Sequence, residues 1–335
     1  MATIKVGISD QDAFTLPDLR ARRRLLDRVA AAGLDHITVG DHIGFHGGTG
    51  FDGLITASTL LASHESLPVI VGVYLLGLRH PMLAARQLST LAQAAPGRLT
   101  LGIGVAGEDR REVSNAGVDP DTRGRRLDEA LPLVRRLLTG EEVSHQGEFF
   151  HLEDARILPA PEPAIPMVIG GKGEPAIRRT AAFGDGWLGM FCSARRFAET
   201  KRQILAAAAD LGREAPPWFG VNVWCGLNAD PGRARDFLAA KMEHLYRLPY
   251  EKFRYLAPGG TPKQVAEFLH PFTEAGAEHV TLVPAGESVE AEIDAVAEVR
   301  EHLRAMPQSD GDDGHGPVRH PRRGGVPAPR AGLAR

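Results

Sequence analysis

Residues 68–102, PVIVGVYLLGLRHPMLAARQLSTLAQAAPGRLTLG, contain one complete strand–helix–strand unit. The unit begins with a continuous apolar run, Pro68 to Val73, which is typical of a strand covered on both faces. A helix is predicted to begin at Pro81, because apolar residues repeat at helical spacing until Pro96-Gly97. A second strand, Arg98 to Gly102, follows at once. Two strands joined by a helix predict a parallel sheet.

The same alternation extends in both directions. Further strands are predicted at residues 4–9, 36–40, 166–169, 186–191, 220–227 and 279–283, most of them followed by helical patterns. Eight strand–helix units in about 300 residues fit a closed (β/α)8 TIM barrel better than an open, doubly wound sheet, the alternative. Residues 108–163 break the alternation and are predicted to be an insertion between the fourth and fifth strands, with a helix at 127–138.

The composition limits the classes of partner. With 39 basic and 42 acidic residues the net charge is −3, so no general field attracts nucleic acid or anionic lipid, and we expect small-molecule partners. No apolar run approaches the length of a membrane span and no signal-peptide pattern is present, so a cytoplasmic protein is expected. Cys192 and Cys225 are expected to be buried and unpaired, and no spacing of His, Cys, Asp or Glu resembles a zinc site.

The composition changes at Pro307, where Gly, Pro, Asp and Arg begin to dominate. Such a segment buries too little apolar surface to offset the entropy of ordering it. We therefore expect one barrel domain over residues 1–306 and a disordered tail over 307–335.

One glycine motif is misleading. Gly102 to Gly107 matches G-x-G-x-x-G after a strand, the pattern of a dinucleotide-binding fold. The residues that follow, Glu108 to Glu112, predict only a short charged helix, and the motif follows the fourth strand rather than the first. A classical NAD-binding fold is therefore rejected.

Candidate acid/base groups follow the second strand. Asp41 and His42 stand at its end, before a glycine-rich loop at residues 44–50. Barrel enzymes place such groups at the carboxyl ends of strands, and histidine titrates closest to neutral pH. The alternative is that Asp41 caps a turn and His42 has no role. Glu108 is either a site acid or a charge at a helix N-terminus.

Glycines mark three other strand ends as candidate ligand contacts. Gly72-Val73 permits a bulge toward a flat ligand, and the glycines after strand four bring backbone amides close to a ring; close packing is the alternative. Gly170-Gly171-Lys172 precedes a helix, so bare amides and one lysine predict a phosphate site; the alternative is a tight turn with a solvated lysine. Trp187 is either a pocket wall or a core residue.

In this order, the segments resemble the luciferase-like monooxygenase superfamily, whose members are (β/α)8 barrels that use FMN or the deazaflavin F420. The resemblance covers about residues 4–305 and is carried by Asp41-His42, Arg79-His80-Pro81 to Leu91, Gly97-Arg98-Leu99, Gly102-Ile103-Gly104, Arg123-Gly124-Arg125, Ile169-Gly170-Gly171 and Gly184-Asp185-Gly186-Trp187.

The resemblance implies roles for these positions. Gly72-Val73 would be a non-prolyl cis peptide behind the cofactor ring; Gly102, Gly104 and Gly107 would line the ring pocket; Gly170 and Gly171 would bind the phosphate; and Asp41 and His42 would face the reactive side of the ring. Val105 stands where F420-dependent sugar-phosphate and alcohol dehydrogenases commonly have Glu, which argues against those substrates.

The residues and the resemblance together lead to three hypotheses for the function. The leading hypothesis is an oxidoreductase that moves hydride between F420 or FMN and a small organic substrate. The alternatives are a two-component FMNH2-dependent monooxygenase, supplied by a separate flavin reductase, and a cofactor-binding protein without catalysis. The resemblance also implies a homodimer.

Overall fold

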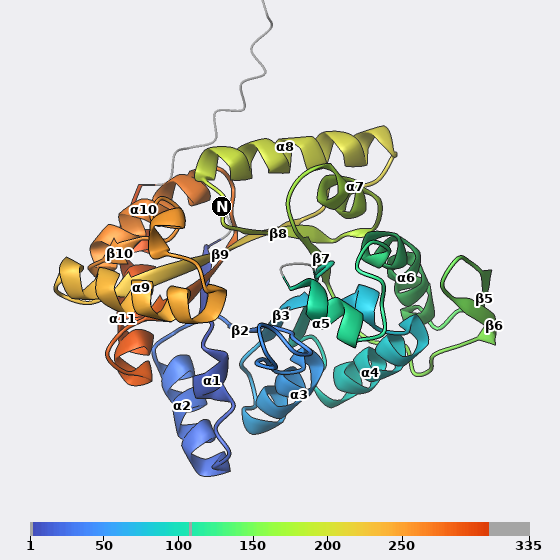
Figure 1. Cartoon of the computed structure of the whole chain (residues 1–335), viewed down its shortest axis with the longest axis horizontal. Helices are drawn as coiled ribbons and strands as arrows, with labels where there is room; N and C mark the ends of the chain where they lie inside the picture. The colour runs from blue at the N-terminus through green and yellow to red at the C-terminus, as the bar shows by residue number, and fades with distance from the viewer. Residues whose placement is uncertain (1–2, 107–108, 308–335) are drawn as a thin grey trace, which may run out of the picture.

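The computed structural model describes residues 3–106 and 109–307. Its eight-stranded parallel barrel runs in chain order through β1 (Lys5–Ile8), β2 (Ile37–Val39), β3 (Val69–Tyr74), β4 (Leu99–Ile103), β7 (Met167–Gly170), β8 (Gly186–Met190), β9 (Trp218–Leu227) and β11 (His279–Ala285). The barrel closes because β11 pairs with β1, in the register Lys5 opposite His279. Figure 1 shows the strands at the centre of the molecule and the helices around them. The predicted (β/α)8 barrel is confirmed.

Helices cover the outside of the barrel: α2 (Leu19–Ala31), α3 (Gly53–Ser63), α4 (Pro81–Ala94), α6 (Arg123–Leu138), α7 (Glu174–Phe183), α8 (Ala194–Asp210), α9 (Pro231–Tyr246), α10 (Pro262–Glu274) and α11 (Val289–Ala305). Smaller elements are α1 (Gln11–Phe14), the 3-10 turns η1 (Leu76–Leu78) and η2 (Tyr250–Lys252), and β10 (Gly259–Gly260), which pairs with β9.

Helix α3 was not predicted from the sequence. Its exposed stripe consists of Ile55, Ser58, Thr59 and Ala62, so the sequence GLITASTLLAS has no charged or strongly polar stripe that would reveal helical spacing. Its start is fixed by Asp52, whose side chain accepts hydrogen bonds from the N–H groups of Leu54 and Ile55.

The predicted insertion is smaller than expected. Helix α6 packs against α4 and α7 and is the barrel's own fourth helix. The additional elements are the short helix α5 (Arg110–Asn115) and an antiparallel hairpin of β5 (Val143–Gln146) and β6 (His151–Ala155). Figure 1 shows the hairpin beyond α6, at the edge of the molecule, whereas α5 lies closer to the barrel strands, beside β3 and β7. Only α5 is therefore placed to contribute to a site at the barrel's end.

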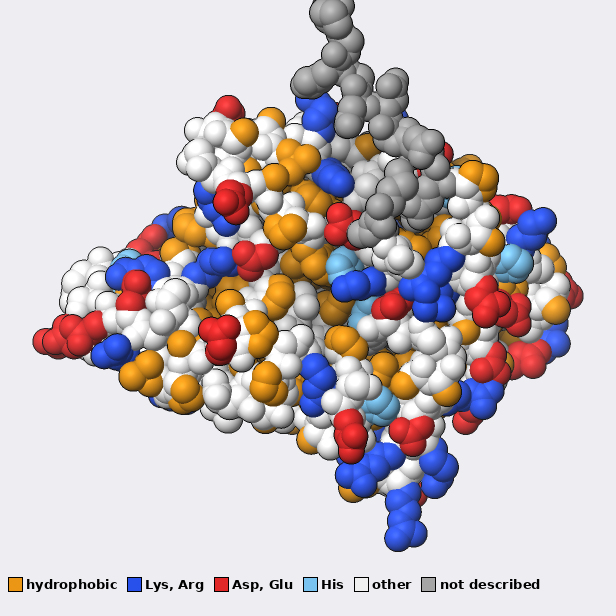
Figure 2. Space-filling model, turned by 180° about the vertical axis from the view of Figure 1, so that it is seen from behind, with side chains coloured by type: hydrophobic (Ala, Val, Ile, Leu, Met, Phe, Trp, Pro, Cys, Tyr) orange, Lys and Arg blue, Asp and Glu red, His pale blue; other side chains and the backbone are white. Residues whose placement is uncertain are grey.

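Both cysteines are buried and unpaired, as predicted. Figure 2 shows the face opposite to that of Figure 1, on which acidic and basic side chains are interspersed. Within residues 3–106 and 109–307, no helix has the length and apolar character needed to cross a membrane. The same residues include no cluster of His, Cys, Asp and Glu that could hold a metal ion. The predicted tail beyond Pro307 lies outside the described residues.

Candidate active site

A cavity of about 1000 Å³ opens at the carboxyl ends of the barrel strands. Each of the eight strands contributes to its wall, either directly or through the residues that follow it: Ser9, Gly40, Gly72, Gly104, Gly170, Leu188, Asn222 and Val283. A cavity of this size at this end of a barrel is the expected place for a ligand and its chemistry.

The end of β3 forms part of this wall. The Gly72–Val73 peptide is cis, as the family resemblance implies, and the pairing of β3 with β4 is irregular between Val71 and Tyr74. Gly104 and Gly170 make room for Val73: a Cβ atom on Gly104 would collide with its side chain, and one on Gly170 would lie 2.6 Å from its Cγ1. The glycines thus allow the Val73 side chain to pack among three strands.

One predicted site residue, Gly102, does not line the cavity, and the position of two others is not described. Gly102 is not among the lining residues; a Cβ atom there would collide with the Val71 carbonyl oxygen, so this glycine permits close packing of β3 and β4. The predicted contact between Gly102 and the ring is therefore not supported. Gly107 and Glu108 lie outside the described residues.

The predicted phosphate site lies between β7 and α7. Gly170, Gly171 and Lys172 all line the cavity, and Gly173, with φ of 80°, caps the helix without any side-chain hydrogen bond. The indole Nε1 of Trp187 donates to the Gly171 carbonyl at 3.0 Å, so this buried side chain is a core residue that fixes the loop. Because the first N–H groups of a helix have no partner within it, the loop can hold an anion.

Asp41 is buried beneath the loop that follows β2. Its carboxylate accepts hydrogen bonds from the N–H groups of Gly53 and Leu75, each at 2.8 Å, and from the two terminal nitrogens of Arg79, Nη1 and Nη2, at 2.7 and 2.8 Å. Burial raises the pKa of this carboxyl, while Arg79 and the two N–H groups act in the opposite direction. Asp41 lines the cavity, and its four hydrogen bonds use the accepting capacity of a carboxylate, so we expect it to hold the loop in place.

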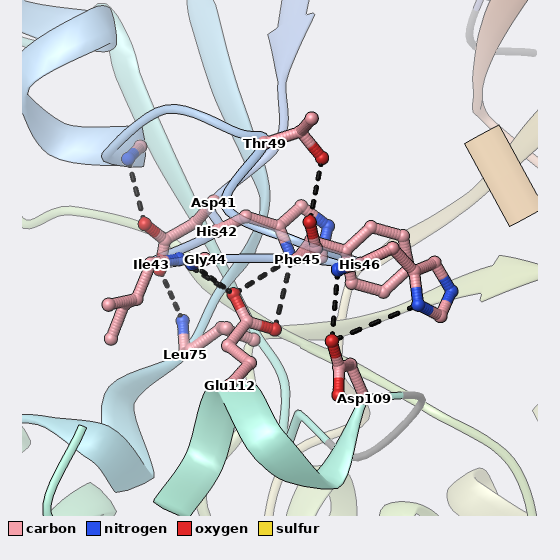
Figure 3. Close-up of polar contacts among 12 residues, drawn as sticks. Asp41, His42, Ile43, Gly44, Phe45, His46, Thr49, Leu75, Asp109 and Glu112 are labelled. Atoms are coloured by element: carbon pink, nitrogen blue, oxygen red, sulfur yellow. Dashed lines mark hydrogen bonds and ion pairs between the residues drawn. The ribbon is translucent and has the colours of Figure 1, made fainter. Parts of the chain in front are cut away.

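His42 lies at the cavity wall beside the carboxylate of Glu112 (Figure 3). Its Nδ1 is 3.2 and 3.3 Å from the two Glu112 oxygens, and its ring stacks on Phe45 at a centroid distance of 4.3 Å. Glu112 also accepts the N–H groups of Ile43 and Gly44. Although burial acts to raise it, these hydrogen bonds from His42, Gly44 and Ile43 hold the pKa of Glu112 below its ordinary value.

Helix α5 makes a second set of polar contacts with the same loop. Asp109, which caps the helix, accepts the N–H of His46 at 2.9 Å, and its carboxylate lies 3.8 Å from the His46 ring (Figure 3). From the other side of the cavity, the Arg247 guanidinium donates to the His46 carbonyl. The loop after β2 is thus held by α5 and by the end of α9. Sequence reasoning found His42 but none of these partners.

The wall formed by β9 carries polar atoms without a protein partner. Among the described residues, Asn222 Oδ1 and Trp224 Nε1 are buried and have no hydrogen-bond partner. Both side chains line the cavity, and Trp224 packs edge-on against Tyr246. Buried polar groups normally find partners, so these atoms fit a bound ring with a polar edge.

Residues 2–259 match the family model described as luciferase-like monooxygenase. The F420-dependent glucose-6-phosphate dehydrogenase of Beutenbergia cavernae is 30% identical over 237 residues, which cover 69% of each chain. An uncharacterized protein of Mycobacterium tuberculosis is 37% identical over 113 residues, 34% of this chain, and the match spans only 38% of that protein. A solved F420-dependent secondary alcohol dehydrogenase, in complex with an F420-acetone adduct, is 18% identical with a TM-score of 0.78, covering 90% of this chain and 99% of that one.

Proposed function

The chain belongs to the luciferase-like monooxygenase family, and on this premise we propose that it is an oxidoreductase that transfers hydride between F420 or FMN and a small organic substrate. One observation carries the proposal. A single cavity brings together the loop at Gly170–Lys172, which has the amides and the lysine to hold an anion, the Gly72–Val73 peptide and the imidazole of His42. Such a cofactor needs a site for its phosphate and a surface for its flat ring, and its reaction needs a group that transfers a proton.

The residues of the cavity divide between holding the cofactor and assisting the reaction. When bound, the cofactor supplies the ring atom that accepts or donates hydride. Gly170, Gly171 and Lys172 would hold its phosphate, and Gly72–Val73 would back its ring. Because Glu112 occupies Nδ1 of His42, the other ring nitrogen, Nε2, remains to hold or release the substrate proton.

The substrate is a separate part of the proposal. The Beutenbergia relative is named for glucose 6-phosphate. Val105, which lines the cavity here, offers no carboxylate to a sugar hydroxyl. We therefore propose a small organic substrate other than a sugar phosphate.

Equilibrium titration with F420 and with FMN, followed by fluorescence, tests the proposal. At least one of the two is expected to bind with a micromolar dissociation constant or better. Lys172→Ala should weaken this binding about tenfold, because a charge-assisted contact to the phosphate is lost. Lys263→Ala is the matched control, since Lys263 is an exposed lysine near the start of α10 and does not line the cavity. Failure of both cofactors to bind at micromolar concentration would refute the proposal.

A two-component monooxygenase is the second candidate, and the family description of the match favours it. Such an enzyme incorporates one atom of O2 and depends on a flavin reductase for FMNH2. Oxygen uptake that requires both added substrate and reductase would establish it. Hydride transfer to or from F420 without oxygen uptake would establish the first candidate instead.

Location and assembly are also proposals. We propose that the enzyme acts in the cytoplasm, in accord with its composition, and that it forms a homodimer, as the resemblance implies. Light scattering that gives the mass of a monomer at micromolar concentration would refute the dimer.

A further inference from the structure

Glu112 reaches His42 from an element outside the regular barrel. It lies on α5, 70 residues further along the chain, and its side chain is only 2% exposed. One of its oxygens, Oε1, accepts the N–H of Ile43 at 2.6 Å and that of Gly44 at 3.2 Å. The same carboxylate faces Nδ1 of His42 (Figure 3). The carboxylate thus contacts three successive residues of the loop.

This contact determines where the imidazole carries its proton. An ionised carboxylate only accepts hydrogen bonds, so the ring nitrogen that faces it must carry hydrogen. In a neutral ring, Nε2 is then the nitrogen without a proton. The stacked ring of Phe45 restricts rotation of the imidazole about its axis.

We propose that Glu112 is a positioning residue that holds His42 in the tautomer protonated on Nδ1, so that Nε2 exchanges the proton with the substrate. The effect on turnover rests on the proposed function. The tautomer itself does not, because it can be measured without cofactor or substrate.

The variant Glu112→Gln makes a sharp test, because the loop dictates how the new amide is oriented. The N–H groups of Ile43 and Gly44 hold the amide oxygen at the position of Oε1, so the amide NH2 group takes the position of Oε2, 3.3 Å from Nδ1 of His42. A donor at that distance favours an Nδ1 without hydrogen, and we expect the ring proton to shift toward Nε2. Nitrogen-15 NMR of the imidazole in cofactor-free protein is expected to show Nδ1–H in the original protein and Nε2–H in the variant.

Glu129→Gln is a matched control. Glu129 accepts hydrogen bonds from a histidine ring, His145 Nε2 at 3.0 Å, and from the N–H groups of Phe149 and Phe150 at 3.0 and 2.9 Å. It contacts the hairpin and does not line the cavity. The same chemical change there should leave the His42 tautomer and turnover unaltered.

Turnover gives the second readout. Glu112→Gln is expected to lower kcat about a hundredfold, the size of a lost proton-transfer contribution, while KM changes less than about threefold. In a His42→Ala background the same substitution should cause no further loss, because Glu112 acts through His42. A protein whose His42 carries its proton on Nε2 overturns the proposal, and this spectrum decides even when the Gln variant does not fold. A Glu112→Gln variant that keeps both the Nδ1–H tautomer and full turnover overturns it as well. If no substrate is turned over, the proposed function fails, whereas the spectrum still decides the tautomer.

Discussion

Among single residues, Glu112 makes the free energy of unfolding depend on pH. Its pKa is lower in the folded protein than its ordinary value of 4.5, so its contribution is complete above about pH 4.5 and is lost as the pH falls through the folded value. Glu112→Ala should cost about 2 kcal/mol of unfolding free energy at pH 7, because His42 and the N–H groups of Ile43 and Gly44 lose hydrogen bonds to a charged acceptor.

Urea unfolding at neutral and acid pH checks this prediction. The difference between the original protein and Glu112→Ala should shrink below about pH 4.5. Glu153, an exposed residue of β6, is the control, and Glu153→Ala should change stability by less than about 0.5 kcal/mol. A cost for Glu112→Ala that does not change with pH would contradict the account.

The residues that the sequence could identify are those that follow a strand directly. His42 and Gly170 were found because each stands where a strand pattern ends, and barrel geometry brings such positions together. Glu112 could not be found in this way. It lies on a six-residue helix, and only tertiary packing brings it to a histidine 70 residues earlier.

At the scale of elements, the buried pair of Asp41 and Arg79 joins the end of β2 to the segment between η1 and α4. The side chain of Asp41 is fully buried and that of Arg79 is 15% exposed. Arg79→Met should cost about 3 kcal/mol, because it leaves a buried charge without its partner. Arg125→Met is the control, since the ion pair of Arg125 with Glu148 is half-exposed and contributes about 0–1 kcal/mol. Equal losses for the two variants in denaturant unfolding would be inconsistent with this assignment.

Helices and strands could be predicted from the sequence where the buried face is apolar and the exposed face is polar. Helix α4 alternates buried and exposed residues at helical spacing between Pro81 and Ala94, so its start and end were evident. Helix α3 also has an exposed stripe, but Ile55 and Ala62 occupy it, so the two faces do not differ in polarity. The β5–β6 hairpin is short and largely exposed, so it lacks a continuous apolar strand pattern.

At the scale of the whole molecule, closure of the barrel buries both thiols. Burial raises the pKa of Cys192 to about 11, and that of the Cys225 thiol rises still further. Because the thiolate is the reactive form, neither should react readily with a disulfide reagent in the folded protein at pH 8. Two equivalents should react after unfolding in guanidinium chloride. Rapid labelling of the folded protein would contradict the closed packing described here.

Closure also creates the site, since it brings together residues that lie in, or directly after, each of the eight strands. We propose that this cavity holds a redox cofactor and that His42 transfers the proton. Turnover and the cofactor dissociation constant, measured together for His42→Ala, test both parts. Turnover is expected to fall at least about a hundredfold while the dissociation constant changes less than about threefold. Unchanged turnover, or a loss of cofactor binding as large as the loss of turnover, would contradict it.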